Sequence, residues 1–213
     1  MRTSLRGGLA ERRSRTVQGR RFQDSLLFLA KWLRSPLKIA AVMPSSPDLA
    51  ATMAACVPVE GDGLVVELGG GTGALTQGLI ERGIAPERLV VIERDFGFYK
   101  ILRERFPAAN VVLGDAADLT RLVRAAGFAS RPVTAVVSGL PILTFPDELQ
   151  EVILREACQL MEADGLFGQF TYGFGPPVPA KRLKRWGLAG DLAGHAMRNV
   201  PPAHVWVFRR DEG

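Results

Sequence analysis

From residue 64 onwards, short apolar runs alternate with stretches in which apolar residues recur every three or four positions. The first pattern is typical of buried strands and the second of amphipathic helices. The predicted strands cover residues 64–68, 89–93, 110–113, 133–138 and 165–172, and the predicted helices cover 74–82, 97–106, 117–126 and 147–162. Residues 195–200 and 203–209, separated by two prolines, predict a terminal hairpin. This order predicts an α/β domain in which crossover helices connect parallel strands.

The N-terminal part of the chain has a different pattern. Residues 1–21 contain seven arginines and few large apolar side chains, so burial cannot offset the entropy lost on ordering, and we expect a disordered arm. Apolar residues then recur at helical spacing opposite basic ones, which predicts an amphipathic helix and linker over residues 22–46. A further helix is predicted from Pro47 to Cys56, since proline suits a first turn after a capping serine. The folded domain is expected to span residues 47–213.

Composition places the chain among intracellular globular proteins. Its 213 residues, 47% of them hydrophobic, are enough for one sizeable core. Cys56 and Cys158 lie in apolar segments, which predicts two reduced thiols and no disulfide framework. No uncharged stretch approaches the roughly 18 apolar residues of a spanning helix, and the N-terminus lacks the features of a secretory signal. We therefore expect a cytoplasmic protein.

The net charge of +5 is unevenly distributed along the chain. Residues 1–38 carry ten lysines and arginines against two acids, a net charge of +8, whereas the remaining residues have a net charge of −3. A basic segment beside a mildly acidic body is attracted to polyanions, either nucleic acid or an anionic membrane surface. Charge alone does not choose between them.

A glycine-rich loop follows the first strand of the domain. Glu67 precedes Gly69, Gly71, Thr72 and Gly73, and a helical pattern begins directly afterwards. Glycines allow a tight turn and let the backbone approach a bound nucleotide. The spacing departs from the NAD fingerprint Gly-x-Gly-x-x-Gly, and an acid precedes the first glycine by two residues. S-adenosylmethionine has no phosphate and carries cationic groups, so this loop favours that cofactor; a tight turn without a ligand is the alternative.

Two further acids stand at the predicted ends of the next two strands, where ligands bind in open α/β sheets. Glu93, twenty residues after the last loop glycine, is expected to accept the ribose hydroxyls. Asp115 is expected to accept from the adenine amino group, with the backbone N–H of Ala116 donating to a ring nitrogen. Arg94, beside Glu93, is counted with the cofactor site. Each acid alone would more often be a surface residue, but their joint placement favours a shared site.

The loop after the fourth predicted strand should face the transferable methyl group. It reads Ser138, Gly139, Leu140, Pro141 and Ile142. In enzymes that methylate nucleobase amines, the corresponding loop resembles Asn-Pro-Pro-Tyr, in which a polar side chain receives the amine and an aromatic ring stacks on the base. Here serine stands for asparagine and isoleucine for the aromatic residue. We expect Ser138 and Gly139 at the reacting amine, with Ser138 also beside the cofactor.

These two loops and the run Lys-Ile-Ala-Ala-Val-Met-Pro-Ser-Ser at residues 38–46 together resemble the bacterial phospholipid N-methyltransferases, which are related to rRNA adenine dimethylases. The resemblance covers about residues 25–209. It implies a class I methyltransferase fold, a Rossmann-like, seven-stranded, mostly parallel sheet with a C-terminal β-hairpin. It also implies S-adenosylmethionine as cofactor without a metal, and stepwise conversion of phosphatidylethanolamine to phosphatidylcholine by a protein associated peripherally with the cytoplasmic face of the membrane.

The amphipathic segment fits the membrane role. Lys31, Arg34 and Lys38 on its polar side, together with Trp32, suit the interface of an anionic bilayer. The alternative is a helix that packs on the core with its charges in water.

The acceptor site is assigned from side-chain chemistry. Tyr172, at the end of the fifth predicted strand, can hold a cationic headgroup by cation–π attraction worth roughly 0.5–2 kcal/mol and relay a proton through its hydroxyl. A tyrosine that closes the core is the alternative. His195 and Arg198, with Ser45 or Ser46, are candidates for binding the lipid phosphate.

The rival function is methylation of rRNA, in which the basic N-terminus would follow phosphates. The missing loop aromatic and the lack of an added C-terminal nucleic-acid domain disfavour it. We therefore expect a phospholipid substrate and no nucleic-acid partner. The oligomeric state is left open.

Overall fold

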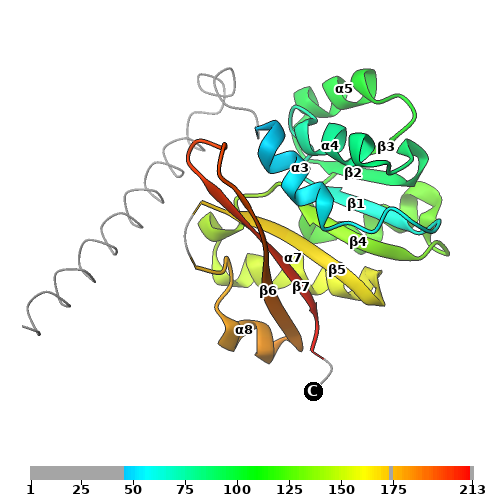
Figure 1. Ribbon diagram of the computed structural model, residues 1–213. Coiled ribbons are helices and arrows are strands. Elements are labelled where there is room, and N and C mark those ends of the chain that lie inside the picture. The colour runs from blue at the N-terminus through cyan, green and yellow to red at the C-terminus, as the bar shows by residue number, and fades with distance from the viewer. Residues whose placement is uncertain (1–45, 173–174, 212–213) are drawn as a thin grey trace, which may run out of the picture. The chain divides into compact units, whose positions relative to one another are not determined.

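Helices and strands alternate along the computed structural model, which describes residues 46–172 and 175–211 (Figure 1). The strands are β1 (Leu64–Leu68), β2 (Leu89–Glu93), β3 (Asn110–Leu113), β4 (Val133–Ser138), β5 (Met161–Thr171), β6 (Leu188–Ala196) and β7 (Ala203–Arg210). The α-helices are α3 (Pro47–Ala55), α4 (Ala74–Arg82), α5 (Phe96–Arg105), α6 (Leu119–Val123), α7 (Asp147–Leu160) and α8 (Ala180–Arg185). Short helical turns are η1 (Pro86–Arg88), η2 (Ala116–Asp118), η3 (Arg124–Phe128) and η4 (Ile142–Thr144).

The seven strands form one sheet in the order β3-β2-β1-β4-β5-β7-β6. Strands β1 to β5 pair in parallel, and β7 is antiparallel to both of its neighbours, β5 and β6. This topology confirms the predicted class I methyltransferase sheet.

Helices cover both faces of the sheet. Leu49 of α3, Leu79 of α4 and Leu102 of α5 belong to the apolar core on one face. Helices α6, α7 and α8 contribute to the core on the other face. Every residue of β1 and β2 is buried, which explains why these strands are continuous apolar runs apart from the two acids. Each fully buried large aliphatic side chain contributes about 1.5–3 kcal/mol to stability.

The predicted bounds of β1 to β4 and of α4 are confirmed, and the other elements differ at their ends. Helix α5 begins one residue early because Asp95 caps it, accepting the Phe98 N–H at 3.0 Å. Helix α7 ends at Leu160, and β5 starts at once at Met161, earlier than predicted. The predicted helix 117–126 is divided into η2, α6 and η3. Gly127 at φ 92° interrupts the last of these.

The strand predicted at 195–200 is wrong in its bounds, because β6 covers Leu188–Ala196. Most β6 residues between its ends are exposed, and the strand is rich in alanine and glycine. An edge strand of this composition has neither the apolar alternation nor the β-branched residues that identify strands in sequence. The predicted strand 203–209 matches β7 within one residue.

The direction of the hairpin decides where its turn lies. Because β7 runs antiparallel to both β5 and β6, the β6–β7 turn stands at the edge where β1, β2, β4 and β5 end. This carboxyl edge is where ligands bind in open α/β sheets. In Figure 1 the tip of the hairpin lies near the end of β5 and the start of α3.

Candidate functional site

The glycine-rich loop between β1 and α4 has three residues at positive φ. Gly69, Gly71 and Gly73 have φ of 74°, 52° and 86°. A Cβ at Gly69 would lie 2.6 Å from the Leu140 side chain, and one at Gly73 would collide with the Phe106 ring. A Cβ at Gly71 would meet no atom within 4 Å in the described part of the chain. Of the three, Gly71 therefore leaves open space beside the backbone, whereas the other two glycines allow the protein to pack on itself.

Glu67 is a fully buried acid at the end of β1. Its Oε2 accepts the Thr76 hydroxyl at 2.6 Å, while Oε1 has no hydrogen-bond partner among the described residues. Burial, the first cause, and repulsion from Glu93 raise the pKa of this carboxyl to about 8, although the Thr76 hydrogen bonds lower it. An unpartnered buried acceptor is costly. A cationic ligand at Oε1 would stabilise the carboxylate, so Glu67 fits the amino or sulfonium group of S-adenosylmethionine.

Glu93, the last residue of β2, is hydrogen-bonded to two loops, the glycine-rich loop after β1 and the loop that leads into α5. One carboxylate oxygen accepts the Gly71 N–H at 2.8 Å, and the other accepts the Asp95 N–H at 2.7 Å. The side chain is buried, so these bonds fix both the glycine-rich loop and the start of α5. Each carboxylate oxygen can accept a second bond. Glu93 thus shapes the proposed cofactor cradle, which is formed by Glu67, residues 69–73 and Glu93. Its carboxylate can still accept hydrogen bonds from ribose hydroxyls.

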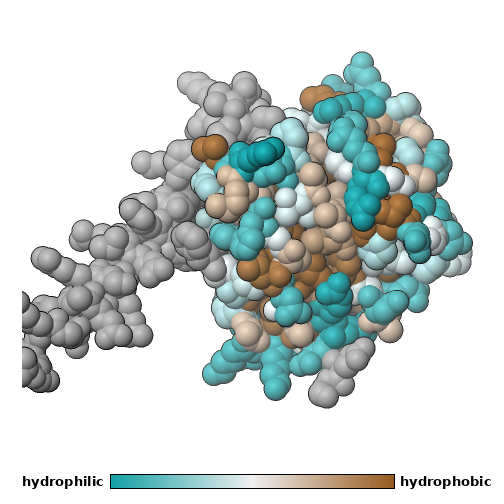
Figure 2. Space-filling model, viewed as in Figure 1, coloured by the Kyte–Doolittle hydropathy of each residue, from teal (hydrophilic) through white to brown (hydrophobic). Residues whose placement is uncertain are grey.

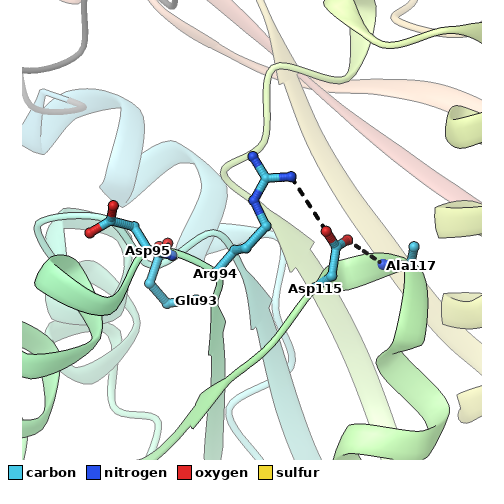
Figure 3. Close-up of polar contacts among 5 residues, drawn as sticks. All are labelled: Glu93, Arg94, Asp95, Asp115 and Ala117. Atoms are coloured by element: carbon cyan, nitrogen blue, oxygen red, sulfur yellow. Dashed lines mark hydrogen bonds and ion pairs between the residues drawn. The ribbon is translucent and has the colours of Figure 1, made fainter.

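Arg94 and Asp115 form an exposed ion pair beside this cradle (Figure 3). Arg94 Nη1 lies 3.4 Å from Asp115 Oδ2, with side chains 82% and 45% exposed. The other Asp115 oxygen accepts the Ala117 N–H at 3.0 Å and so caps η2, whose first residue is the buried Ala116. An exposed pair contributes about 0–1 kcal/mol. The ion pair therefore holds Arg94 only weakly against Asp115.

The remaining loop residue of the predicted cofactor set is Thr72. Its carbonyl accepts the Arg105 guanidinium at 2.9 Å. The structure thus brings the loop, Glu67, Glu93 and Asp115 to one edge of the sheet.

The loop after β4 lies directly against the glycine-rich loop. The Gly139 N–H donates to the Leu68 carbonyl at 2.8 Å, and a Cβ at Gly139 would approach the Gly69 carbonyl to 2.9 Å. Ser138 is buried, and its hydroxyl accepts the Leu140 N–H at 3.3 Å. The contact brings the predicted methyl-donor loop and the predicted amine loop together.

Sequence reasoning missed Gln169 on β5, the register partner of Ser138. Its fully buried amide donates to the carbonyls of Leu140 at 2.9 Å and Phe170 at 3.0 Å. Its Oε1 has no hydrogen-bond partner within the described residues, and the same holds for Nε1 of Trp206, its partner on β7. A neutral amide within a strand carries no pattern that sequence reading detects.

A second network joins the end of β5 to α3 and the hairpin turn. Asn199 interacts with the Tyr172 hydroxyl and accepts the Ser46 N–H at 3.2 Å. The Ser46 hydroxyl caps α3 by accepting the Leu49 N–H at 3.2 Å. Burial raises the pKa of Tyr172, while the Asn199 hydrogen bond lowers it. Asn199 was also missed from sequence.

The other predicted phosphate ligands lie near this network. The Arg198 backbone N–H donates to Asp48 Oδ2 at 2.9 Å, and the Arg198 side chain is exposed. His195 meets His204 across the hairpin, Nδ1 to Nδ1, at 2.8 Å. Burial, followed by the charge of His195, lowers the pKa of His204. The contact needs one donor and one acceptor nitrogen, so the Nδ1–H of one ring donates to Nδ1 of the other.

Several predictions fall outside the described residues, namely Ser45 and the proposed membrane-binding residues Lys31, Trp32, Arg34 and Lys38. Among the described residues, no helix is long and apolar enough to span a bilayer. Within the same residues, no cluster of three or more His, Cys, Asp or Glu side chains is arranged to hold a metal ion. Cys56 and Cys158 are free thiols.

A seven-stranded sheet of this order defines the class I methyltransferase fold, and here the glycine-rich loop and the site acids lie at its carboxyl edge. Similar solved structures include the TehB-like SAM-dependent methyltransferase of Corynebacterium glutamicum, with a TM-score of 0.56 and 18% identity over 88% of this chain and 98% of that chain. The CcbJ methyltransferase of Streptomyces caelestis has a TM-score of 0.56 and 18% identity over 80% and 91% of the two chains. At this identity the likeness shows the fold.

The sequence itself matches a named enzyme more closely. The chain is 41% identical over 190 residues to the ornithine lipid N-methyltransferase of Singulisphaera acidiphila. The matched region covers 88% of this chain and 96% of that enzyme. The chain belongs to the same family of S-adenosylmethionine-dependent methyltransferases as that enzyme. No protein-family model matches the chain.

Proposed function

We propose that the protein transfers methyl groups from S-adenosylmethionine to the amine of a membrane lipid, with ornithine lipid as the acceptor. The observation that carries this proposal is the 41% identity to an ornithine lipid N-methyltransferase along almost the whole of both chains. The Ser138 loop agrees with it, because it lacks the aromatic residue on which a nucleobase would stack.

Phosphatidylethanolamine, the acceptor implied by the family resemblance, is the second candidate. Both lipids present a primary amine, so the methyl-transfer chemistry is the same. They differ in the anionic group near that amine, which is a carboxylate in ornithine and a phosphate in phosphatidylethanolamine. The relative's substrate favours ornithine lipid.

The cofactor occupies the cradle at the carboxyl edge in this proposal. Glu67 Oε1 faces its cationic amino acid part, Gly71 leaves room for it, and Glu93 accepts from the ribose. Asp115 and Ala116 receive the adenine, for which Arg94 moves aside. When bound, the cofactor supplies an electrophilic methyl group, and the chain contributes binding and alignment, which can account for much of the rate.

The lipid amine lies against the Ser138–Leu140 loop. Gln169 holds this loop through the Leu140 carbonyl and is a positioning residue. The ammonium must lose its proton before it attacks. The raised pKa of Tyr172 keeps its hydroxyl protonated, so that it can relay a proton from the ammonium toward water. Tyr172 is assigned to the acceptor site, where its ring contacts the cationic headgroup.

The proposal assigns membrane binding to the basic arm (1–21) and the amphipathic segment (22–46). Their net positive charge suits the anionic cytoplasmic surface of a membrane, where the lipid substrate is found. This places the enzyme peripherally on the membrane.

The test is methyl transfer from labelled S-adenosylmethionine into vesicles. Vesicles contain ornithine lipid or phosphatidylethanolamine, each with and without phosphatidylglycerol, and purified rRNA is a parallel acceptor. We expect label in ornithine lipid, increased by the anionic lipid. The negative control is Gly71→Asn, which should give no labelled lipid. Asparagine tolerates a φ of 52°, so the loop can keep its conformation, and the new side chain occupies the open space of the cradle. Label in rRNA alone would refute the lipid assignment, and label in phosphatidylethanolamine alone would replace ornithine lipid as the acceptor.

A further inference from the structure

Two large apolar side chains are exposed at the tip of the β6–β7 hairpin. Val200 is 67% exposed and Met197 is 65% exposed, the highest values among the large hydrophobic residues that the structure describes. Apolar surface is visible at the position of this tip in Figure 2. Single exposed apolar residues are ordinary on protein surfaces. This pair differs from such residues in two ways: it lies at the carboxyl edge of the sheet, and hydrogen bonds fix the turn that carries it.

The tip projects from the edge of the sheet that holds the proposed active site. β6 runs parallel to β5, so residues 197–202 follow the carboxyl edge on which the glycine-rich loop and the Ser138 loop also lie. A surface that contacts this tip therefore faces the edge where methyl transfer is proposed to take place.

The chain between the two apolar residues is anchored. Asn199 is 3% exposed; it accepts the Ser46 N–H at 3.2 Å and donates to the Pro201 carbonyl at 2.7 Å. The Arg198 N–H donates to Asp48 Oδ2 at 2.9 Å. With Asn199 held inward on α3, its neighbours on the tip are displayed outward on a supported turn.

We propose that this tip inserts into the interface of an anionic bilayer and orients the active-site edge toward its lipid. Met197 and Val200 enter the boundary between headgroups and acyl chains, and the exposed Arg198 meets the lipid phosphates. The choice of a bilayer as the partner rests on the proposed lipid substrate. The tip is a contact separate from the basic N-terminal segment and sets the orientation of the folded domain.

Insertion can be read at single sites in the full-length protein. A fluorophore sensitive to polarity is attached to Val200→Cys in a background in which Cys56 and Cys158 are alanine. Val152→Cys on α7, with Val152 42% exposed, is the matched control. The probe solution contains vesicles of phosphatidylcholine and phosphatidylglycerol, some carrying nitroxide-labelled acyl chains, and no methyl donor.

On vesicle-bound protein, we expect a blue-shifted emission and quenching by the nitroxide at position 200 and neither change at position 152. Equal, water-like emission at both positions would overturn the proposal. A blue shift at position 200 without vesicles would also overturn it, because another part of the chain would then cover the tip.

A kinetic comparison separates this proposal from the proposed function. The double variant Met197→Asp and Val200→Asp should lose about tenfold or more of its methyl transfer to vesicles, since two apolar contacts are replaced by charges. Its transfer to the same lipid dispersed in detergent micelles should stay within about twofold of wild type. An equal loss in both assays would overturn the orienting role. If wild type methylates no lipid but position 200 still inserts, the proposed function fails while the tip proposal stands.

Discussion

Without cofactor, the wild-type protein should lose stability as pH rises because of Glu67. The substitution Glu67→Gln should abolish this pH dependence. The wild-type carboxyl is fully buried, and its pKa is raised from 4.5 to about 8, chiefly by burial. Between these two values the folded protein binds a proton that the unfolded chain releases, so the free energy of unfolding falls as pH rises.

The size of the effect follows from the two pKa values. Each pH unit in this window costs about 1.4 kcal/mol, which gives a penalty of about 1 kcal/mol at pH 5 and about 4 kcal/mol at pH 8. Wild type should therefore lose about 3 kcal/mol relative to Glu67→Gln between pH 5 and pH 8. The glutamine amide introduces a buried donor without a partner, but that cost of about 1–3 kcal/mol does not depend on pH.

The assay is urea unfolding of both proteins without cofactor at a series of pH values. Glu81→Gln, which removes an exposed glutamate of α4, is the matched control and should run parallel to wild type. Parallel curves for wild type and Glu67→Gln would refute the raised pKa. Calorimetry of S-adenosylmethionine binding at pH 7 in buffers of different ionisation enthalpy should show release of about one proton in wild type and none in the variant, since a cation at Oε1 favours the carboxylate.

Three further substitutions test individual residues of the site. Glu93→Ala should weaken S-adenosylmethionine binding at least about tenfold by calorimetry, because two backbone N–H groups, of Gly71 and Asp95, lose their acceptor; unaltered affinity would contradict its role in the cradle. Gln169→Met, close in shape but without the amide, should lower kcat about tenfold or more and change cofactor affinity less than about threefold. A larger loss of cofactor affinity than of kcat would show that Gln169 acts on the cofactor site instead. Tyr172→Ala should slow methyl transfer to lipid while cofactor affinity stays within a few-fold, and unchanged turnover would remove Tyr172 from the acceptor site.

The central sheet could be predicted from sequence because burial on both faces imposes continuous apolar runs. Strands β1, β2 and β4 are of this kind, and their predicted bounds match the structure. β6 lies at the edge of the sheet with much of its length in water, so its sequence is under no such constraint. The end of α7 was also misplaced, because its last turn passes into β5 without an intervening loop residue.

The positions of the site acids could also be predicted, since each lies close to the carboxyl end of a strand that stands out in sequence as a short apolar run. Their bonding could not, because it depends on partners distant in sequence. Glu93 is held by Gly71, 22 residues earlier. Asn199 is joined to Ser46 across 153 residues. Such contacts arise only when the fold brings loops together, so a cradle-shaping role for Glu93 and the anchored turn at Asn199 required the structure.

Transfer of a deuterated methyl group to ornithine lipid in vesicles, followed by fragmentation of the product in a mass spectrometer, tests the proposed activity most directly. The label should be found on the amine of the headgroup, and the product should be absent with Gly71→Asn. Label on the carboxylate oxygen, or no labelled lipid from a protein that binds S-adenosylmethionine by calorimetry, would contradict a lipid N-methyltransferase.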